Sequence, residues 1–177
     1  MKRKINKLTY YVLKFLISLW MYFDSRKYMH YYNKLLRHVG MNLKGEPRFI
    51  AKSANFDDFD RITLGDRVVI SLRVYFLTHD YSYTTALISI GEKPKTDVGT
   101  YRDIVIGNNV FIGMNSIILP GTKIGDNVIV GAGSVVRGNI PENSIVAGNP
   151  ANVIGDIRDY AHKVKSRENQ DMIIDKK

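Results

Sequence analysis

Cysteine is absent from this 177-residue chain, and histidine occurs only four times. The missing thiols exclude a disulfide framework and any metal site built on thiolates. The sequence also lacks a Walker loop, a dinucleotide-binding glycine fingerprint and a GxSxG motif, so it carries none of these signatures of phosphate binding or of an activated serine. Any catalysis is therefore expected to depend on acid–base chemistry and not on a covalent intermediate at cysteine or serine.

Long apolar runs are lacking as well. The longest run, Leu8 to Phe23, has 16 residues and contains Lys14, whereas a membrane-spanning helix needs about 20. As a helix it would collect five apolar side chains on one face, those of Leu8, Tyr11, Phe15, Leu19 and Tyr22. Three placements stay open for residues 1–24: packing on the chain's own domain or on a neighbouring subunit, peripheral contact with a membrane surface, and a true span.

Acidic residues are nearly missing from the first quarter of the chain. Residues 1–48 hold 11 Lys and Arg against two acidic residues, a net charge of +9, whereas residues 49–177 hold 15 of each sign. The whole basic excess of the protein therefore precedes residue 49. Because the remainder is neutral, the chain does not have the charge distribution of a nucleic-acid-binding protein, and no nucleic-acid partner is expected.

What the sequence does contain is a period of six residues between Ile104 and Gly148. The first positions of the repeat form an aliphatic row: Ile106, Ile112, Ile118, Ile124, Val130 and Val136. Four of the six second positions are glycine, namely Gly107, Gly113, Gly125 and Gly131. Neither a helix nor an alternating strand keeps such a period. It predicts a parallel β-helix that stacks its aliphatic row, with glycine at corners where other residues would be strained.

The rest of the chain is arranged around these repeats. Residues 1–42 are predicted to be helical, and Asp24 or Ser25 is expected to cap a second helix that ends near His38. Residues 43–155 are predicted to form the β-helix, with residues 80–103 breaking its period as a long extruded loop, and residues 156–177 to form a short C-terminal helix and tail.

The first coils of the β-helix are less regular than the later ones. The aliphatic row continues backwards with an offset of two residues, through Ile50, Phe56 and Ile62 and then Leu64, Ile70 and Phe76. The sequence alone does not decide whether this offset is a bulge or a bend.

His79 is the candidate catalytic residue because it ends a coil where the chain leaves for the long loop. A rigid strand end beside a loop suits a general base, and imidazole titrates near working pH. Asp80 is expected to stabilise the turn and not to orient His79, because neighbours on an extended chain point to opposite sides. No metal site is predicted, since His79 is the one histidine within the coils.

Several segments together resemble the hexapeptide-repeat O-acetyltransferases, and especially small bacterial enzymes that acetylate sugars of surface polysaccharides. The segments are ITLGDRVVIS, LTHDYS, IVIGNNVFIGMNSIILPGTKIGDNVIVGAGSVV and VAGNPANVIG, within residues 35–160. The resemblance implies a left-handed parallel β-helix and a homotrimer with acetyl-CoA in the groove between neighbouring subunits. It also implies that the histidine before the loop, His79, is the catalytic base.

Other residues follow from the resemblance by position. The implied acetyl-CoA contacts are Gly113, Met114, Gly131, Ala132 and Arg137. Asn55 resembles an acceptor-binding asparagine. Apart from the resemblance, Tyr81 and Tyr83 are candidates for stacking on a sugar because they lie in the loop expected to cover the acceptor. Relatives carry phosphate-binding arginines where this chain has Asn152 and Gly155, so Arg158 or Lys163 is expected to replace them.

The sequence thus favours an acetyl-CoA-dependent O-acetyltransferase that acts on a sugar hydroxyl in surface polysaccharide biosynthesis. It is expected in the cytoplasm, with or without peripheral contact at the inner face of the membrane. The alternatives are an N-acetyltransferase of an amino sugar, a drug-modifying acetyltransferase and a non-catalytic β-helix scaffold. A metal-dependent β-helix of the carbonic-anhydrase type is the weakest alternative, for want of histidines.

Overall fold

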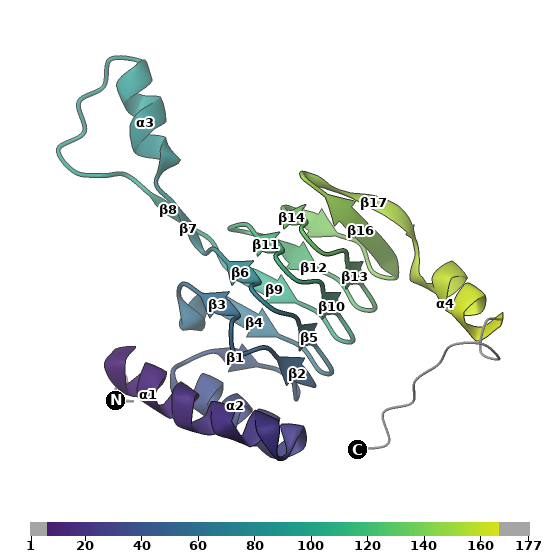
Figure 1. Ribbon diagram of the computed structural model, residues 1–177. Coiled ribbons are helices and arrows are strands. Elements are labelled where there is room, and N and C mark those ends of the chain that lie inside the picture. The colour runs from purple at the N-terminus through teal and green to yellow at the C-terminus, as the bar shows by residue number, and fades with distance from the viewer. Residues whose placement is uncertain (1–6, 167–177) are drawn as a thin grey trace.

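The computed structural model describes residues 7–166, which form a three-sided β-helix with helices at its two ends (Figure 1). We call its sides the first, second and third sheets. The first sheet contains β1 (Asn42–Leu43), β4 (Ile62–Leu64), β9 (Ile104–Ile106), β12 (Lys123–Ile124) and β15 (Asn139–Ile140). The second contains β2 (Phe49–Ile50), β5 (Val69–Ile70), β10 (Phe111–Ile112), β13 (Ile129–Val130), β16 (Ser144–Gly148) and β17 (Ala151–Asp156). The third contains β3 (Asn55–Phe56), β6 (Tyr75–Phe76), β11 (Ile117–Ile118) and β14 (Val135–Val136).

The predicted β-helix is confirmed, and the six-residue period explains its register. Three repeats make one coil, so Ile112 pairs in parallel with Val130, and Ile118 pairs with Val136. Every residue of the aliphatic row is at most 3% exposed. Burying a side chain of this size contributes about 1.5–3 kcal/mol, so the stacked row forms the core of the β-helix.

The glycines of the repeat serve a different purpose from the one predicted. Left-handed backbone angles do recur every six residues, but two positions later, for example at Asn109 and Asn115 with φ of 53° and 59°. At the second position the constraint is space, because a Cβ on Gly113 would lie 2.5 Å from the backbone nitrogen of Ala132 in the next coil. The glycine row therefore lets neighbouring coils approach closely.

The two-residue offset in the first coils lies in the turn from the third sheet to the first. A 3-10 helix, η2 (Phe59–Arg61), precedes β4, and both Ile62 and Leu64 on that strand face the core. As a result Ile50 pairs with Ile70, twenty residues on. The offset is thus an enlarged corner that leaves the strands in register.

The N-terminal helices cover the lower end of the β-helix in Figure 1. They are α1 (Lys7–Ser18), a 3-10 segment η1 (Leu19–Tyr22) and α2 (Ser25–His38), which Asp24 caps by accepting hydrogen bonds from the backbone of Arg26 and Lys27. Helix α2 buries Tyr28, whose hydroxyl donates to the carbonyl of Ile50 at 2.7 Å. The helices and the first coil therefore share one core.

Helix α1 packs on its own domain, but through the side opposite to the predicted apolar face. Tyr10 is buried, and Leu13 and Ile17 pack against the core. The predicted face stays in solvent, with Phe15 64% exposed and Tyr22 74% exposed. No helix within residues 7–166 is long and apolar enough to cross a membrane.

The segment predicted as a loop is more ordered than expected. It projects from the β-helix (Figure 1) and contains helix α3 (Ser82–Ser89), and its two ends pair as β7 (His79–Asp80) and β8 (Thr100–Tyr101). At the other end of the chain, β17 returns antiparallel to β16, which the sequence did not predict, before helix α4 (Ile157–Ser166). The predicted C-terminal tail from residue 167 onward lies outside the described residues.

Candidate active site

His79 lies at the corner that leads from the third sheet to the first, where the inserted segment departs. We call the turns stacked along this edge the third corner. The imidazole is half-buried, and its Nδ1 atom lies 3.6 Å from Oδ2 of Asp57 and 3.6 Å from Oδ2 of Asp58. These two residues occupy the enlarged turn of the coil below, just before η2. Two carboxylates from one coil thus face one nitrogen of the histidine in the next.

Thr78 holds both carboxylates in place. Its backbone N–H donates to Asp57 Oδ2 at 3.2 Å, and its hydroxyl donates to Asp58 Oδ2 at 2.6 Å. The Nδ1 atom of His79 is itself buried and, among the described residues, has no hydrogen-bond partner within range. A proton on Nδ1 would face two negative charges, which favours the tautomer whose Nε2 lone pair is free to accept a proton.

Two tyrosines from the base of the inserted segment border the imidazole. The rings of Tyr81 and Tyr101 lie 5.5 Å and 5.6 Å from the ring of His79, and their hydroxyls are 2.6 Å apart. This hydrogen bond raises the pKa of Tyr81 above its ordinary value. The predicted sugar-stacking residue Tyr81 therefore does lie beside His79, and it forms a pair with Tyr101.

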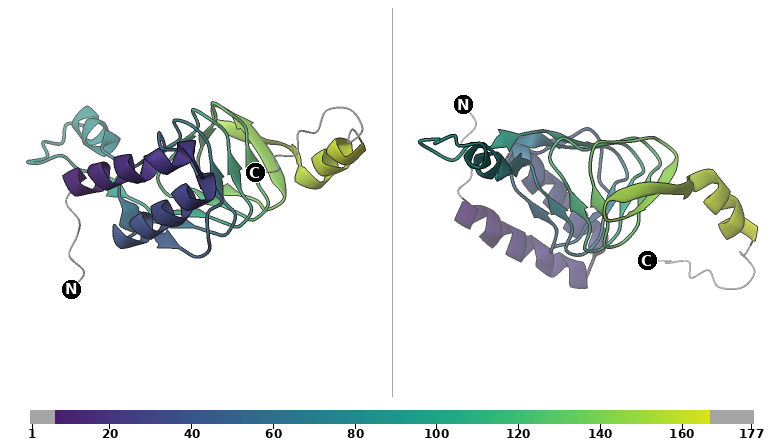
Figure 2. Two further views of the ribbon diagram at one scale, coloured as in Figure 1. Left: turned by 60° about the horizontal axis from the view of Figure 1, so that its bottom comes forward. Right: turned by 90° about the horizontal axis from the view of Figure 1, so that it is seen from above.

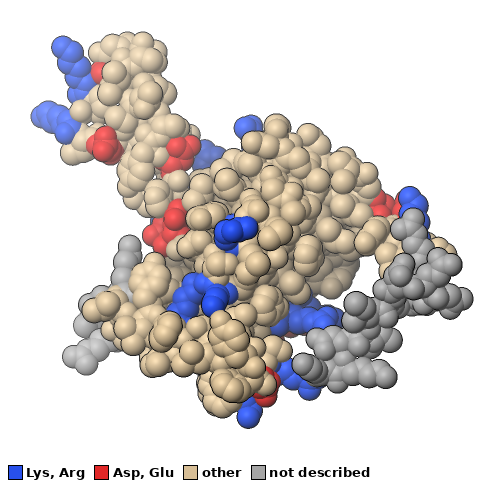
Figure 3. Space-filling model, viewed as in Figure 1, with Lys and Arg blue, Asp and Glu red and all other residues tan. Residues whose placement is uncertain are grey.

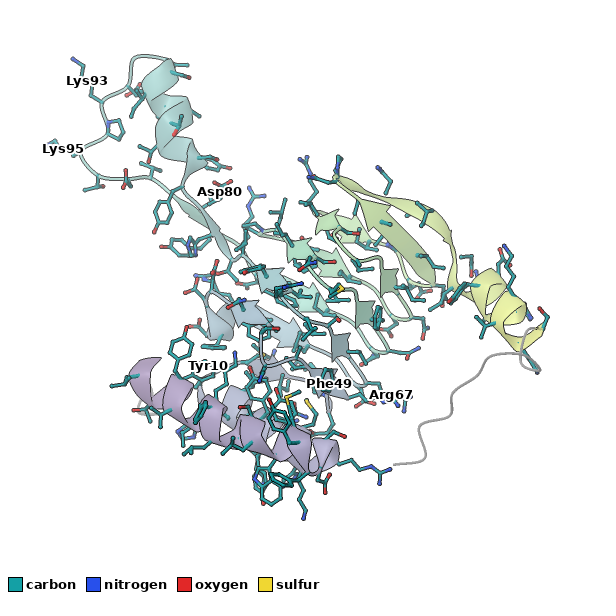
Figure 4. All side chains as sticks on the ribbon, in the orientation of Figure 1. Tyr10, Phe49, Arg67, Asp80, Lys93 and Lys95 are labelled. Carbon is teal, nitrogen blue, oxygen red and sulfur yellow. The ribbon has the colours of Figure 1, made fainter. Side chains whose placement is uncertain are left out.

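Arg61 supports this pair from the β-helix. Its guanidinium lies 5.4 Å from the ring centre of Tyr101 and forms a 2.9 Å ion pair with Asp103. Asp80 takes the predicted turn role: its carboxylate accepts a hydrogen bond from the backbone of Ser82 at 2.8 Å, which lowers the pKa of Asp80. Figure 4 shows Asp80 at the root of the projecting segment.

The structure brings together four of the residues predicted to contact acetyl-CoA. Gly113 and Met114 follow β10, and Gly131 and Ala132 follow β13 one coil above. They stack directly, since the backbone carbonyl of Met114 accepts a 2.8 Å hydrogen bond from Gly133. These four residues lie in the turn that leads into the third sheet, whereas His79 lies just after that sheet. Within one chain the third sheet therefore separates His79 from the four residues.

The remaining predicted residues are placed less favourably. Arg137 is exposed after β14, on the third corner. Asn55 points from the outer face of the third sheet and donates to the carbonyl of Ser53 at 2.9 Å, and no hydrogen bond or ring contact joins it to His79 in residues 7–166. Arg158 is engaged by its neighbour Asp156, which leaves it a poor replacement for the missing arginines.

Asp57 and Asp58 are the site residues that sequence reasoning missed. The signal was present, because the register that aligns Phe56 with Phe76 puts these aspartates directly beneath Leu77 and Thr78. Tyr101 could not have been found in this way, since its position depends on the β7–β8 pairing inside the inserted segment.

The family model described as bacterial transferase hexapeptide (six repeats) matches residues 103–138. Over 139 residues the chain is 37% identical to a protein described as the putative lipopolysaccharide biosynthesis O-acetyl transferase WbbJ of Escherichia coli K12, covering 72% of this chain and 69% of that one. It is 41% identical over 131 residues to protein CapG of Staphylococcus aureus, covering 73% of each.

Solved structures agree with these similarities. A galactoside acetyltransferase in complex with coenzyme A superposes with a TM-score of 0.62 at 25% identity, over 96% of this chain and 86% of that one. A maltose O-acetyltransferase from Clostridium difficile 630 superposes with a TM-score of 0.60 at 26% identity, over 85% of each. With its six-residue period, its β-helix and these relatives, the chain belongs to the hexapeptide-repeat acetyltransferases.

Proposed function

We propose that this protein transfers the acetyl group of acetyl-CoA to a hydroxyl of a sugar in surface polysaccharide biosynthesis, in the cytoplasm, with His79 as general base. The observation that carries the proposal is the placement of the His79 Nδ1 atom 3.6 Å from each of two carboxylates. The resemblance to WbbJ supports a glycan acceptor, and the galactoside and maltose acetyltransferases support a sugar hydroxyl.

The chain's own groups would carry the proton transfers. Acetyl-CoA supplies an activated thioester. Nε2 of His79 takes the proton of the acceptor hydroxyl as its oxygen bonds to the thioester carbonyl carbon, while Asp57 and Asp58 stabilise the imidazolium. When the carbon–sulfur bond breaks, the same Nε2 returns the proton to the departing thiolate. One residue thus takes up and returns the proton. Because the acceptor oxygen attacks the thioester directly, no covalent enzyme intermediate is required.

The stacked residues Gly113, Met114, Gly131 and Ala132 fit the extended arm of coenzyme A. A Cβ at Gly113 or Gly131 would meet the next coil within 3 Å, and the exposed Met114 and Ala132 leave backbone groups at the edge of the stack. Arg137 would then meet the phosphates as an exposed cation. Asn55 and Tyr81 remain proposals for the acceptor, and Tyr81 is the better supported because its ring lies beside His79.

We propose a homotrimer whose active sites lie between subunits. The outer face of the second sheet carries an apolar row in register, Phe49, Val69, Phe111, Ile129 and Ile145. The corresponding row of the first sheet is mostly polar: Asn42, Thr63, Val105, Lys123 and Asn139. A second copy covering the apolar row would explain it. A shared site would also bring His79 of one subunit to the stacked residues of another.

The test is acetyl transfer from acetyl-CoA to a panel of nucleotide sugars, lipid-linked glycans and simple glycosides, read as thiol release and as an acetyl mass increment on the acceptor. The expected result is His79-dependent acetylation of a sugar hydroxyl. Acetylation confined to amino groups, or none with any acceptor while coenzyme A binds, would contradict it. Replacing residues 82–99 by a short turn should change acceptor preference more than the apparent affinity for acetyl-CoA.

A further inference from the structure

A continuous apolar surface covers the outer side of the N-terminal helices. We call it the outward face, formed on α1, η1 and the residue after them by Tyr11, Val12, Phe15, Leu16, Leu19, Trp20, Tyr22 and Phe23. Their exposed fractions run from 38% for Trp20 to 84% for Phe23. In Figure 3 the N-terminal helices form the largely tan lobe at the lower left. Soluble proteins rarely leave so many large apolar side chains together in water.

The packing of the helix does not account for this surface. Tyr10, Leu13, Ile17 and Met21 already fix α1 and η1 to the core from the other side, and Figure 4 shows Tyr10 between α1 and the β-helix. Even Lys14 turns inward: its Nζ bonds to the carbonyl of Ala54 at 3.3 Å, and burial lowers its pKa to about 8. A lysine is thus withdrawn from solvent on the very helix whose apolar residues are exposed.

Positive charge borders the η1 end of the outward face. The ammonium of Lys27 lies 5.1 Å from the ring centre of Trp20, and that of Lys52 lies 3.3 Å from the hydroxyl of Tyr22. The chain ahead of α1 begins MKRK, and residues 1–48 carry a net charge of +9. A second copy of this face would bring two such charges together. Anionic headgroups would be complementary to it, since basic residues near a membrane surface are attracted to anionic lipids.

We propose that the outward face docks on an anionic phospholipid bilayer, with α1 and η1 lying in the headgroup region. The 12 residues of α1 and four of η1 are too few to cross the bilayer but suffice to lie in its surface. Trp20 and Tyr22, at the end of the face, are side chains that favour the membrane–water interface, and Phe23 beside them adds apolar surface that can enter it.

Docking would also place the active site near the lipid. The ring of Tyr10 contacts that of Phe59 at 4.9 Å, and Phe59 follows Asp58, which faces His79. The N-terminal end of α1 and the inserted segment project on the same side of the β-helix (Figures 1 and 2). An acceptor glycan carried by a lipid would then present its hydroxyls close to His79. This consequence rests on the proposed acetyl transfer, whereas the docking does not.

The test is co-sedimentation of the full chain with vesicles, without acetyl-CoA or acceptor, so that its result is independent of catalysis. Vesicles of phosphatidylglycerol and phosphatidylethanolamine should bind the protein at least tenfold more tightly than vesicles of phosphatidylcholine, and salt should weaken the binding. Phe15→Glu and Phe23→Glu should each reduce binding at least tenfold. The matched control Ile154→Glu, at a 66% exposed site on β17 at the other end of the β-helix, should leave it unchanged.

Three outcomes would overturn the docking. One is no binding to anionic vesicles. Another is equal binding by the outward-face variants and the Ile154→Glu control, with circular dichroism showing all of them folded. The third is a fall in solution mass, measured by light scattering, in Phe15→Glu and Phe23→Glu without a vesicle-binding defect. That result would assign the face to contact between copies of this chain.

Discussion

The three corners of the β-helix differ in how closely their residue spacing follows the six-residue repeat. At the corners entering the second and third sheets, successive core residues are six apart from β4 onward, as from Ile106 to Ile112 and on to Ile118. At the third corner the spacing is six residues only from Ile118 to Ile124, and it is eight from Phe56 to Leu64, thirty from Phe76 to Ile106 and four from Val136 to Ile140. His79, Asp57, Asp58 and Arg137 all lie along this irregular edge. Two corners keep the stack in register, which leaves the third free to vary and to hold the chemistry.

The largest effect is expected from the loss of His79, which lies on the irregular edge. His79→Ala should reduce acetyl transfer by roughly 10²–10⁴ while leaving coenzyme A binding nearly unchanged, because a general base contributes that much to the rate. The measurement is kcat with a responsive acceptor, together with calorimetric binding of coenzyme A. Asn109→Gly at a regular corner is the control and should keep its activity. Full activity in His79→Ala would reject the assignment.

Truncating a side chain of the buried aliphatic row should destabilise the protein more than truncating one on the outer face of the β-helix. Ile106→Ala removes a side chain that is 1% exposed and should lower the free energy of unfolding by about 2–5 kcal/mol. Its neighbour Val105 lies on the outer face of the same strand and is 37% exposed. Val105→Ala should therefore lower the free energy of unfolding by less than about 1 kcal/mol. Urea unfolding of both variants checks this. Similar losses in the two would mean that the row does not carry the stability.

Loss of Asp57 or Asp58 should lower the rate less than loss of His79, because the two carboxylates act through the imidazole. Asp57→Asn and Asp58→Asn should each lower kcat about 10- to 100-fold, as loss of an orienting partner of a catalytic group typically does. The Michaelis constants for acetyl-CoA and the acceptor should stay nearly unchanged, because the carboxylates act on the imidazole in the transition state and not on substrate binding. A rise in KM at constant kcat would instead indicate a structural or acceptor-binding role.

The smallest effect is expected at a regular corner. Arg67 adopts a left-handed φ of 55°, in the position that Asn109 and Asn127 occupy one and two coils above. A left-handed angle costs a residue with a Cβ about 1–2 kcal/mol, so Arg67→Gly should raise the free energy of unfolding by up to about 1 kcal/mol. Gly133→Ala, at φ of 71°, should lower it by a similar amount. Effects of the same sign in the two variants would contradict the argument.

The sequence by itself determined the periodic part of the protein. A six-residue aliphatic row can be buried only by coils that stack in register, so the β-helix, its core and the position of His79 at a coil end could all be predicted. The capped helix α2 followed equally from local chemistry, through Asp24. Local pattern was enough wherever the neighbours in space are fixed by the period.

Only the tertiary structure decided what depends on contacts between non-repeating segments. The role of the Gly113 row came from the approach of the next coil. The outward side of α1 was set by which residues Tyr10 and its neighbours could reach in the core, not by the apolar pattern of the helix. Asp58 and Tyr101 meet His79 because an enlarged turn and a strand pair converge on one edge. Such convergence depends on three-dimensional distances that no period in the sequence encodes.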